Sequence, residues 1–372
     1  MTASSCRVHL DWDNFRHNLR LLKSRGKTLL PIIKADAYGH GVLRASEELT
    51  ELGIGWAAIG TLEEGCDVRD HGYRGRIVSL LCRTLSPADV RLAREKRIIP
   101  LIHSEQGLNA VADAVRAESS ETPLPVAVKV DTGMARLGFR ADDMERVAAF
   151  FAENPGLYPV LMVSHLSVAD VPEEEAYTRM QAERFARAAE IMRRRFPSML
   201  TSLGNTAGLM SHADIMGDLC RPGLAVYGYN PLFGTSREGD CEGMRPVMSV
   251  TAPLIGVHPL HKGESLGYGR AYVAESERLV GWVAIGYADA YRRNPAPGTC
   301  MCVNGVRVPV IGRVAMQMTC IDLTDLPEKP SIGDDVYVMG GPGHAVTAQD
   351  LAEWWGTIPY EVICLLGKNT RA

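Results

Sequence analysis

The chain has 372 residues, of which 46% are apolar and 23% are charged, so it carries enough apolar material for two globular domains. A formal net charge of −4 and an isoelectric point near 6.2 argue against nucleic acid or an anionic membrane as the main partner. No apolar run reaches the roughly 18 residues of a membrane span, and no apolar signal core follows Met1. The nine cysteines form neither a disulfide framework nor a zinc site, which favours a reducing, cytoplasmic location and no metal.

Short apolar runs alternate with longer amphipathic ones over the first part of the chain, the pattern of parallel β/α units. Eight candidate strands follow in chain order at 29–35, 55–60, 76–81, 98–103, 125–131, 158–166, 200–207 and 219–229. Helices such as 142–153 and 174–195 carry apolar residues three and four positions apart. Eight alternations predict an α/β fold with a closed (β/α)8 barrel rather than an open sheet.

The pattern changes after Pro231, where helical periodicity fades and β-rich runs take over at 245–257, 279–285, 301–311 and 335–339. Asn304-Gly305 stands between two apolar runs and indicates a hairpin with a type I′ turn. We therefore predict a barrel domain over residues 1–235 and a mainly antiparallel β domain over residues 236–372.

Lys34 ends the first candidate strand, in the run Pro31-Ile-Ile-Lys-Ala-Asp-Ala-Tyr-Gly-His-Gly41. Barrel enzymes keep their chemistry in the loops that follow the strands. A partly desolvated lysine in such a place has a lowered pKa and can form a Schiff base with an aldehyde. The plainer alternative for one lysine is a solvated loop residue.

Polar residues also follow other strands, and together they predict the lining of one pocket. They are Lys129, Asp131 and Arg136 after the fifth strand, Ser164 and His165 after the sixth, Asn205 and Thr206 after the seventh, and Arg221 in the eighth. Each has a plainer explanation. Lys129 and Asp131 could form an interior ion pair, His165 could be a core histidine, Asn205 and Thr206 could cap a helix, and Arg221 could lie at the surface.

A phosphate site is predicted near the eighth strand, where barrels usually hold one. Gly223 and the residues after it offer backbone N–H groups, and the Thr206 hydroxyl and a tyrosine would complete the cradle. The chain has no P-loop or dinucleotide fingerprint there. A lysine for an aldehyde beside a phosphate cradle predicts pyridoxal 5′-phosphate (PLP) as the cofactor.

With these residues in place, the chain resembles the PLP-dependent alanine racemases over nearly its whole length. The matching motifs occur in order: Lys-Ala-Asp-Ala-Tyr-Gly-His-Gly, Asp-Thr-Gly-Met-Ala-Arg-Leu-Gly-Phe, Ser-His-Leu-Ser-Val-Ala-Asp, Arg-Pro-Gly-Leu-Ala-Val-Tyr-Gly, Leu-Gly-Tyr-Gly-Arg, Gly-Tyr-Ala-Asp-Ala-Tyr and Thr-Ile-Pro-Tyr-Glu. The resemblance implies a barrel plus a β domain, and a head-to-tail homodimer with shared active sites. The implied activity is interconversion of L- and D-alanine, which supplies D-alanine for cell-wall peptidoglycan.

The resemblance also implies two catalytic groups, Lys34 and a Tyr268 delivered by the partner subunit. Racemisation removes the α-proton from one face and returns a proton to the other, so two groups must flank the α-carbon. A tyrosine needs help to ionise at neutral pH, and Arg136 would favour the phenolate. In the family a carbamylated lysine often holds this arginine, and Lys129 occupies that position. For Tyr268 the alternative is a core tyrosine of the β domain.

Further roles follow from the resemblance alone. Arg221 would meet the pyridine nitrogen, His165 would support the ring, and the Met316 N–H and Arg136 would bind the substrate carboxylate. The cofactor would also contact Asn205, and its phosphate would be held by Tyr38, Thr206, the Gly223 and Leu224 amides, and Tyr360. The corridor that admits small amino acids would be lined by Tyr287, Arg293, Arg313, Asp170 and Ile358.

Several positions depart from the commonest family pattern, chiefly Gln317 in place of an aspartate, Ala315, Leu166, Thr206, Ala135 and Ala290. The Gln317 change removes a negative charge near the substrate. A racemase that also accepts serine, or a related PLP barrel decarboxylase, is therefore the alternative function. A PLP carrier protein is disfavoured because such proteins are single barrels without a β domain.

Overall fold

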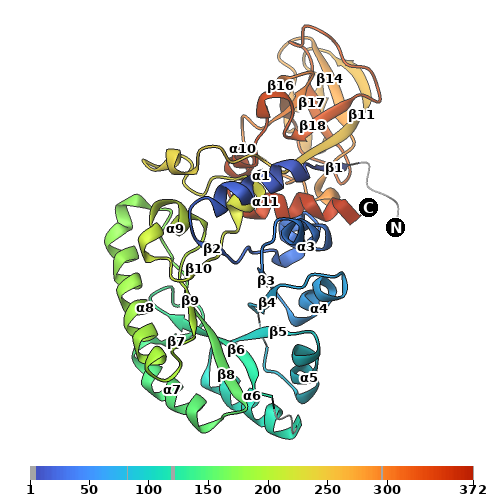
Figure 1. Cartoon of the computed structure of the whole chain (residues 1–372). Helices are drawn as coiled ribbons and strands as arrows, with labels where there is room; N and C mark the ends of the chain where they lie inside the picture. Colours follow the sequence, from blue (N-terminus) through green and yellow to red (C-terminus); the bar gives the residue numbers. More distant parts are fainter. Residues whose placement is uncertain (1–5, 82, 119–121, 295, 372) are drawn as a thin grey trace. The chain divides into compact units, whose positions relative to one another are not determined.

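The computed structural model describes residues 6–81, 83–118, 122–294 and 296–371 (Figure 1). The chain forms two compact units. The barrel unit comprises Asp13–Ala37 and Val42–Arg245, and the β unit comprises the described part of Met1–Trp12, Tyr38–Gly41 and the described part of Pro246–Ala372. The units thus change at Arg245/Pro246 rather than at 235/236, and strand β1 (Arg7–Leu10) pairs with a strand of the β unit.

The described part of the barrel unit contains eight parallel strands, six in one sheet and two in a second, and an isolated bridge and a backbone hydrogen bond join the two sheets into a ring, which confirms the predicted (β/α)8 architecture. In ring order the strands are β2 (Thr28–Leu29), β3 (Trp56–Ile59), β4 (Arg76–Ser79), β5 (Ile98–Ile102), β6 (Leu124–Asp131), β8 (Leu157–Val163), β9 (Leu200–Ser202) and β10 (Leu219–Cys220). The bridge Ile32↔Ala58 joins the chain after β2 to β3. The N–H of Arg221 donates to Gly204 O at 3.0 Å between β9 and β10, and β10 pairs with β2.

Helices surround this ring on its outside (Figure 1). They are α1 (Trp12–Lys23), α3 (Val42–Glu51), α4 (Leu62–Asp70), α5 (Pro87–Glu95), α6 (Glu105–Glu118), α7 (Met144–Glu153), α8 (Glu175–Arg195) and α9 (Thr206–Ser211). Each longer helix buries one apolar face, as α6 does with Leu108, Val111 and Val115. The two last strands are shorter than predicted because Asn205 caps α9 and a 3₁₀ turn begins at Leu224.

The segment after Lys34 is a left-handed helical turn, α2 (Lys34–Gly39). Ala35, Asp36, Ala37 and Tyr38 have φ between 52° and 56°. Left-handed helix costs L-residues about 1–2 kcal/mol each, so other bonds must hold the turn. The Ala37 N–H donates to Ile33 O at 2.9 Å, and the Val42 N–H donates to Asp36 Oδ1 at 2.9 Å.

The β unit is built on one antiparallel sheet in the order β1-β11-β14-β17-β16-β15-β18, and β11 also pairs with β18. Its strands after β1 are β11 (Met248–Leu260), β14 (Arg278–Val283), β15 (Cys300–Val303), β16 (Val306–Ile311), β17 (Thr319–Asp322) and β18 (Asp335–Met339), with a small β12 (Ser265–Leu266) and β13 (Tyr272–Val273) pair. Two helices, α10 (Ala348–Trp355) and α11 (Pro359–Leu366), follow. Asn304 and Gly305 have φ of 50° and 81° and join β15 to β16, so the predicted hairpin is confirmed.

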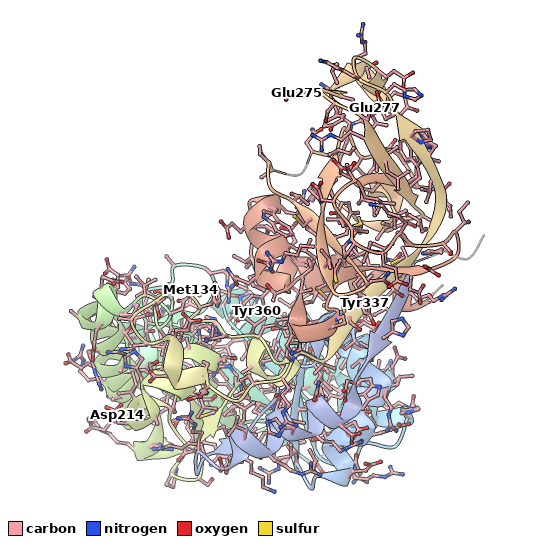
Figure 2. All side chains as sticks on the ribbon, turned by 90° about the horizontal axis from the view of Figure 1, so that it is seen from above. Met134, Asp214, Glu275, Glu277, Tyr337 and Tyr360 are labelled. Atoms are coloured by element: carbon pink, nitrogen blue, oxygen red, sulfur yellow. The ribbon has the colours of Figure 1, made fainter. Side chains whose placement is uncertain are left out.

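The β unit has its own apolar core, in which Leu260, Leu266, Val280 and Cys320 are buried together. At one end of this unit, Glu275 and Glu277 lie in the connection between β13 and β14 (Figure 2). Glu277 accepts a hydrogen bond from His261 at 2.7 Å. None of the helices in the described chain is both long and apolar enough to cross a membrane.

Candidate active site

Arg221 joins two neighbouring strand ends inside the barrel and is only 4% exposed, so the surface-arginine alternative is wrong. Its Nη1 donates to the Ser202 carbonyl and hydroxyl oxygens, both at 2.7 Å. Its Nη2 donates to the Ser164 carbonyl and to Leu203 O at 3.2 Å. Burial lowers the pKa of Arg221 to about 10, which leaves the guanidinium charged at neutral pH. Both terminal nitrogens serve the strand ends, and Nε is the remaining donor for a bound group.

His165 lies against Arg221, with His165 Nδ1 3.4 Å from Arg221 Nη2. Burial, followed by the positive charge of Arg221, holds the pKa of His165 well below its usual value. The ring is therefore neutral at physiological pH, and it is half-buried rather than enclosed in the core.

Lys129 and Arg136 extend this concentration of positive charge. Burial, and then the charges of Arg221 and Arg136, hold the pKa of Lys129 well below its usual value, although Asp131 opposes the shift. Asp131 Oδ1 accepts the N–H groups of Gly133 and Ala135 at 2.9 and 3.0 Å, so this carboxylate braces the loop that carries Arg136. With Lys34, whose charge also lowers the pKa of His165, these basic residues form what we call the cationic cluster, in which the neutral His165 lies among charged groups: Lys34, Lys129, Arg136, His165 and Arg221.

Lys34 stands beside the end of β3. A Cβ added to Gly60 would make an ordinary contact with the Lys34 Cβ at 3.5 Å but would lie 2.8 Å from Glu64 Oε2, so the glycine leaves room for the Glu64 carboxylate. The Glu64 carboxylate accepts the Gly60 N–H at 2.7 Å and the Ala35 N–H at 2.9 Å, and it thereby ties the turn after Lys34 to β3. Glu64 was not among the predicted site residues. Its signal is the capping box Thr61-Leu-Glu-Glu64 at the start of α4, which is legible in the sequence.

The residues predicted to hold a phosphate in the barrel unit come together at α9. Thr206 Oγ1 accepts the Gly223 N–H at 2.9 Å, so that amide is already engaged, while the hydroxyl can still donate its own hydrogen. Asn205 Oδ1 accepts the Gly208 N–H at 3.0 Å, and Asn205 Nδ2 donates to Leu166 O at 3.2 Å. The helix-cap alternative for Asn205 is thus confirmed, and its side chain serves the backbone.

Tyr38 and Tyr360 meet in the β unit, although they are more than 300 positions apart in the sequence. Their ring centroids are 5.7 Å apart in an edge-to-face arrangement. Burial, and then the neighbouring Tyr360, raise the pKa of Tyr38, so its hydroxyl stays protonated. Tyr360 is labelled in Figure 2.

Tyr268 lies on the surface of the β unit with 65% of its area exposed, so the core-tyrosine alternative is wrong. Arg293 stacks over the rings of Tyr268 and Tyr287, with its guanidinium carbon 6.0 and 5.5 Å from the two centroids. Arg313 lies beside Gly269, the residue that follows Tyr268. A Cβ added to Gly269 would be 3.1 Å from Arg313 Nη1. Of the predicted corridor residues, Arg293 therefore links the predicted catalytic tyrosine to Tyr287, and Arg313 lies beside the following glycine.

Met316 lies in the same surface region and is 57% exposed. Its loop is held by backbone bonds, since the Tyr287 N–H donates to Ala315 O at 3.2 Å and the Ala288 N–H donates to Met316 O at 2.9 Å. Gly286 makes this approach possible, because a Cβ there would lie 2.3 Å from Ala315 O and 2.4 Å from Met316 O. The remaining corridor residues, Asp170 in the barrel unit and Ile358 in the β unit, are exposed.

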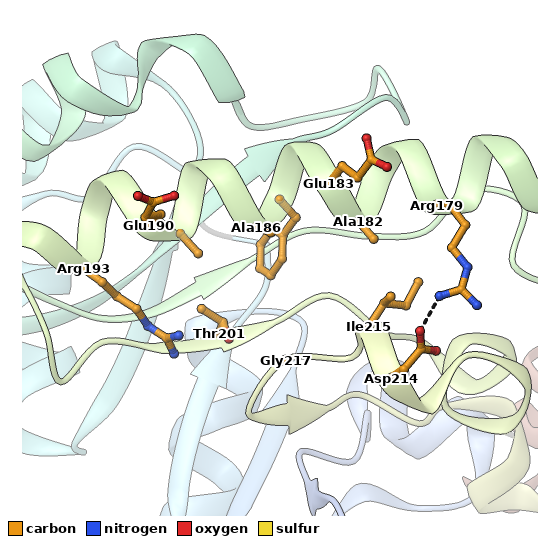
Figure 3. Close-up of a pocket in the computed structure, with 12 residues that line it drawn as sticks. Arg179, Ala182, Glu183, Ala186, Glu190, Arg193, Thr201, Asp214, Ile215 and Gly217 are labelled. Atoms are coloured by element: carbon orange, nitrogen blue, oxygen red, sulfur yellow. Dashed lines mark hydrogen bonds and ion pairs between the residues drawn. The ribbon is translucent and has the colours of Figure 1, made fainter.

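A cavity of about 680 Å³ opens elsewhere on the barrel unit, between α8 and the segment around β9 (Figure 3). Arg179 points across it to Asp214, and its floor is formed by small apolar side chains of α8 such as Ala182 and Ala186. None of the predicted site residues lines it. Among the described residues, no group of three or more His, Cys, Asp and Glu side chains could hold a metal ion.

Comparison with known proteins decides the family. The model of the alanine racemase N-terminal domain matches residues 10–231, and that of the C-terminal domain matches residues 247–372. The chain belongs to the alanine racemase family. It is 44% identical to the alanine racemase of Nitratidesulfovibrio vulgaris (strain Miyazaki F), over 96% of this chain and 94% of that protein.

Solved structures of alanine racemases have the same fold. The Streptomyces coelicolor A3(2) enzyme superposes with a TM-score of 0.88 at 30% identity, over 98% of this chain and 96% of that chain. The Bartonella henselae alanine racemase, which carries covalently bound pyridoxal phosphate, has a TM-score of 0.86 at 23% identity, over 99% and 98% of the two chains. The cationic cluster falls within the N-terminal family domain, and Tyr268 and Met316 fall within the C-terminal one.

Proposed function

We propose that this protein interconverts L- and D-alanine with pyridoxal 5′-phosphate as cofactor and supplies D-alanine for cell-wall peptidoglycan in the cytoplasm. The family assignment over both domains supports the reaction. The observation that carries the proposal is the cationic cluster inside the barrel, in which Lys34 is the first residue of the left-handed turn α2.

The barrel residues fit this cofactor chemically. A phosphorylated ligand with an aldehyde needs an amine and compensation for negative charge, and the cluster supplies both. Arg221 has Nε left for a ring nitrogen, and as an arginine it would leave that nitrogen unprotonated. Lys34 would hold the aldehyde carbon, Thr206 would donate to the phosphate, and the neutral His165 would support the ring. Tyr38 and Tyr360 are proposed for the phosphate as well.

The proton steps are assigned to two side chains. When bound, the cofactor would supply an electron sink that makes the α-proton of the substrate more acidic. Lys34 Nζ is proposed to remove or return that proton on one face, and Tyr268 Oη on the other. Arg136 and the Met316 N–H would hold the substrate carboxylate, so that the α-carbon lies between the two groups. Arg293 lies over the Tyr268 ring and Arg313 lies beside Gly269, so two guanidinium groups border the proposed proton donor and acceptor.

Lys129 is proposed to be a carbamate in the active protein. Burial and the neighbouring guanidinium charges depress its pKa and so raise the share of neutral amine, which is the form that attacks CO2. A new N–C bond forms, one proton leaves the nitrogen, and the resulting anion would neutralise part of the cluster and hold Arg136. Carbon-13 bicarbonate should therefore give one carbamate resonance that Lys129→Ala abolishes. A spectrum without that resonance in the unmodified protein would contradict this assignment.

The proposed site is shared between two copies of the chain. Tyr268, Tyr287, Met316 and Met318 leave 65%, 39%, 57% and 39% of their areas exposed in the β unit, an apolar surface suited to a second copy. If the sites are shared, mixed dimers of Lys34→Ala with Tyr268→Ala contain one intact site. An equilibrated equal mixture should then regain about a quarter of the unmodified activity, because half of the dimers are mixed. No recovery, with mixed dimers verified by mass spectrometry, would place both groups on one chain.

The decisive experiment measures exchange and racemisation together. In deuterated water, L- and D-alanine should each exchange the α-hydrogen for deuterium and convert to the opposite enantiomer. The purified protein should also absorb visible light through its bound cofactor. Lys34→Ala should abolish the absorption and the reaction, whereas the exposed lysine variant Lys23→Ala should retain both. Release of CO2 without exchange would favour a decarboxylase. A panel of alanine, serine and lysine would decide whether Gln317 broadens the substrate range.

A further inference from the structure

Gln181 of α8 is fully buried and uses every hydrogen-bonding position of its amide. Its Oε1 accepts the Ser167 N–H and the Ser167 hydroxyl, both at 3.0 Å. Its Nε2 donates to His165 O at 3.1 Å and to Thr132 Oγ1 at 3.3 Å. A buried amide with four partners is strongly constrained, because moving any partner leaves a polar group unpaired.

These partners lie at two neighbouring strand ends of the site. Thr132 follows β6, while His165 and Ser167 follow β8. The contacts continue inward, since the hydroxyls of Thr132 and Ser164 are 2.9 Å apart and the Ser164 carbonyl accepts from Arg221. Hydrogen bonds thus connect the outer helix α8 through Thr132 to Ser164, and the backbone of Ser164 in turn contacts the buried guanidinium.

The same face of α8 also holds the loop that carries Arg136. Tyr177 and Arg184 lie four positions before and three after Gln181, so all three share a face. The Tyr177 hydroxyl donates to Gly133 O at 2.7 Å, and Arg184 Nη1 donates to Thr132 O at 3.2 Å. Tyr177 and Arg184 therefore hold the backbone of Thr132 and Gly133 from outside the barrel, at the start of the loop that carries Arg136.

We propose that Gln181 is a positioning residue, which through Thr132 and the backbone of His165 sets the placement of the His165 ring and of the Arg136 loop. The expected effect of Gln181 on catalysis rests on the proposed function, whereas its positioning of the two strand ends is a property of the barrel unit alone. Gln181 touches no substrate in this assignment. It acts because a displacement of about 1 Å in a site can cost about a hundredfold in rate.

The test compares Gln181→Met, which keeps the length and removes the polar atoms, with Gln181→Glu, which keeps the acceptor for Ser167 and loses the donor. Tyr177→Phe removes only the bond to Gly133 and, at 36% exposure, leaves the core intact. The matched control is Tyr158→Phe, which removes an exposed bond to Ser198 Oγ at the opposite end of β8.

Hydrogen–deuterium exchange of the holoenzyme should become about tenfold faster at residues 132–138 and 165–168 in Gln181→Met, with the other barrel strands unchanged. In Tyr177→Phe the faster hydrogen–deuterium exchange should be confined to residues 132–138. The visible circular dichroism of the bound cofactor should change in both Gln181 variants, and kcat/KM for alanine should fall about tenfold or more. Tyr158→Phe should match the unmodified protein in all three measurements.

Unchanged exchange and dichroism in Gln181→Met would overturn the proposal. Should that variant fail to fold, Gln181→Glu carries the test, because it loses the donor to Thr132 and His165 O, and its identity with Tyr158→Phe in exchange and kcat/KM would overturn the proposal equally. If the unmodified protein does not racemise alanine, the proposed function fails, whereas the exchange data still decide whether Gln181 holds the two strand ends.

Discussion

Replacing Gly286 by alanine should damage substrate binding through the backbone of the Met316 loop. Gly286 has φ of −149°, an extended conformation that alanine adopts freely, so any effect comes from contact rather than from backbone strain. The added Cβ would meet Ala315 O at 2.3 Å and Met316 C at 2.5 Å, and real Cβ contacts essentially never fall under 3.0 Å. The loop must therefore withdraw by about 0.7 Å, since backbone atoms cannot rotate away as a side chain does.

The magnitude follows from what that loop is proposed to do. Crowding of this kind typically costs about 1–3 kcal/mol of unfolding free energy. A shift approaching 1 Å in a group that binds substrate should lower kcat/KM for alanine by about 10- to 100-fold, mainly through KM. Urea denaturation and a racemisation assay over a range of alanine concentrations would measure the two effects separately.

Gly256 provides the control within the same unit. A Cβ there would find its nearest atom, Trp282 Cδ1, at 3.9 Å, so Gly256→Ala should leave both quantities within experimental error or add slightly to stability. Two results would refute the reasoning. If Gly286→Ala and Gly256→Ala had the same unfolding free energy and the same KM, the Met316 loop would accommodate the added Cβ without destabilisation. If Gly286→Ala lost stability without any rise in KM, Met316 would not take part in substrate binding.

Three further outcomes are expected. Tyr268→Phe should slow the L-to-D and D-to-L directions unequally, and equal rates with the unmodified protein would remove Tyr268 from the reaction. Ala35→Gly should raise the unfolding free energy by up to about 1 kcal/mol in urea melts, because the exposed Ala35 has φ of 52°, and a decrease would argue against strain in the turn. His165 is neutral in the native protein but protonated in the unfolded chain below its usual pKa of about 6.5, so stability should fall as the pH drops below that value. His165→Asn should flatten this slope between about pH 6.5 and 5, and an unaltered slope would assign the acid sensitivity to other groups.

The order of the barrel strands and the hairpin at Asn304 could be predicted because each depends on local pattern. Alternating apolar runs mark the strands, and Asn-Gly supplies the two positive φ angles that a type I′ turn requires. The strand ends at β9 and β10 were predicted too long. Polar groups there start new helical turns, as Asn205 does by capping α9, and an apolar run alone does not reveal that competition.

The left-handed turn after Lys34 could not be predicted, because Ala35 and Ala37 favour ordinary helix. Besides two local bonds, the turn is held by a partner about thirty positions away, the Glu64 carboxylate. The exposure of Tyr268 is similar, since an aromatic in a β-rich segment usually lies in the core. Long-range contacts decide both cases, and they are set by the folded barrel and sheet rather than by neighbouring residues.

The cationic cluster has a consequence for the lifetime of the chain in a cell. Like charges gathered at one end of the barrel repel one another until an anion compensates them, so the cofactor-free chain stores that repulsion in its folded state. A phosphorylated ligand that binds only the folded form stabilises it in proportion to the logarithm of its concentration. Cofactor supply would then govern abundance as well as activity, because copies made during scarcity would unfold more often and be degraded sooner.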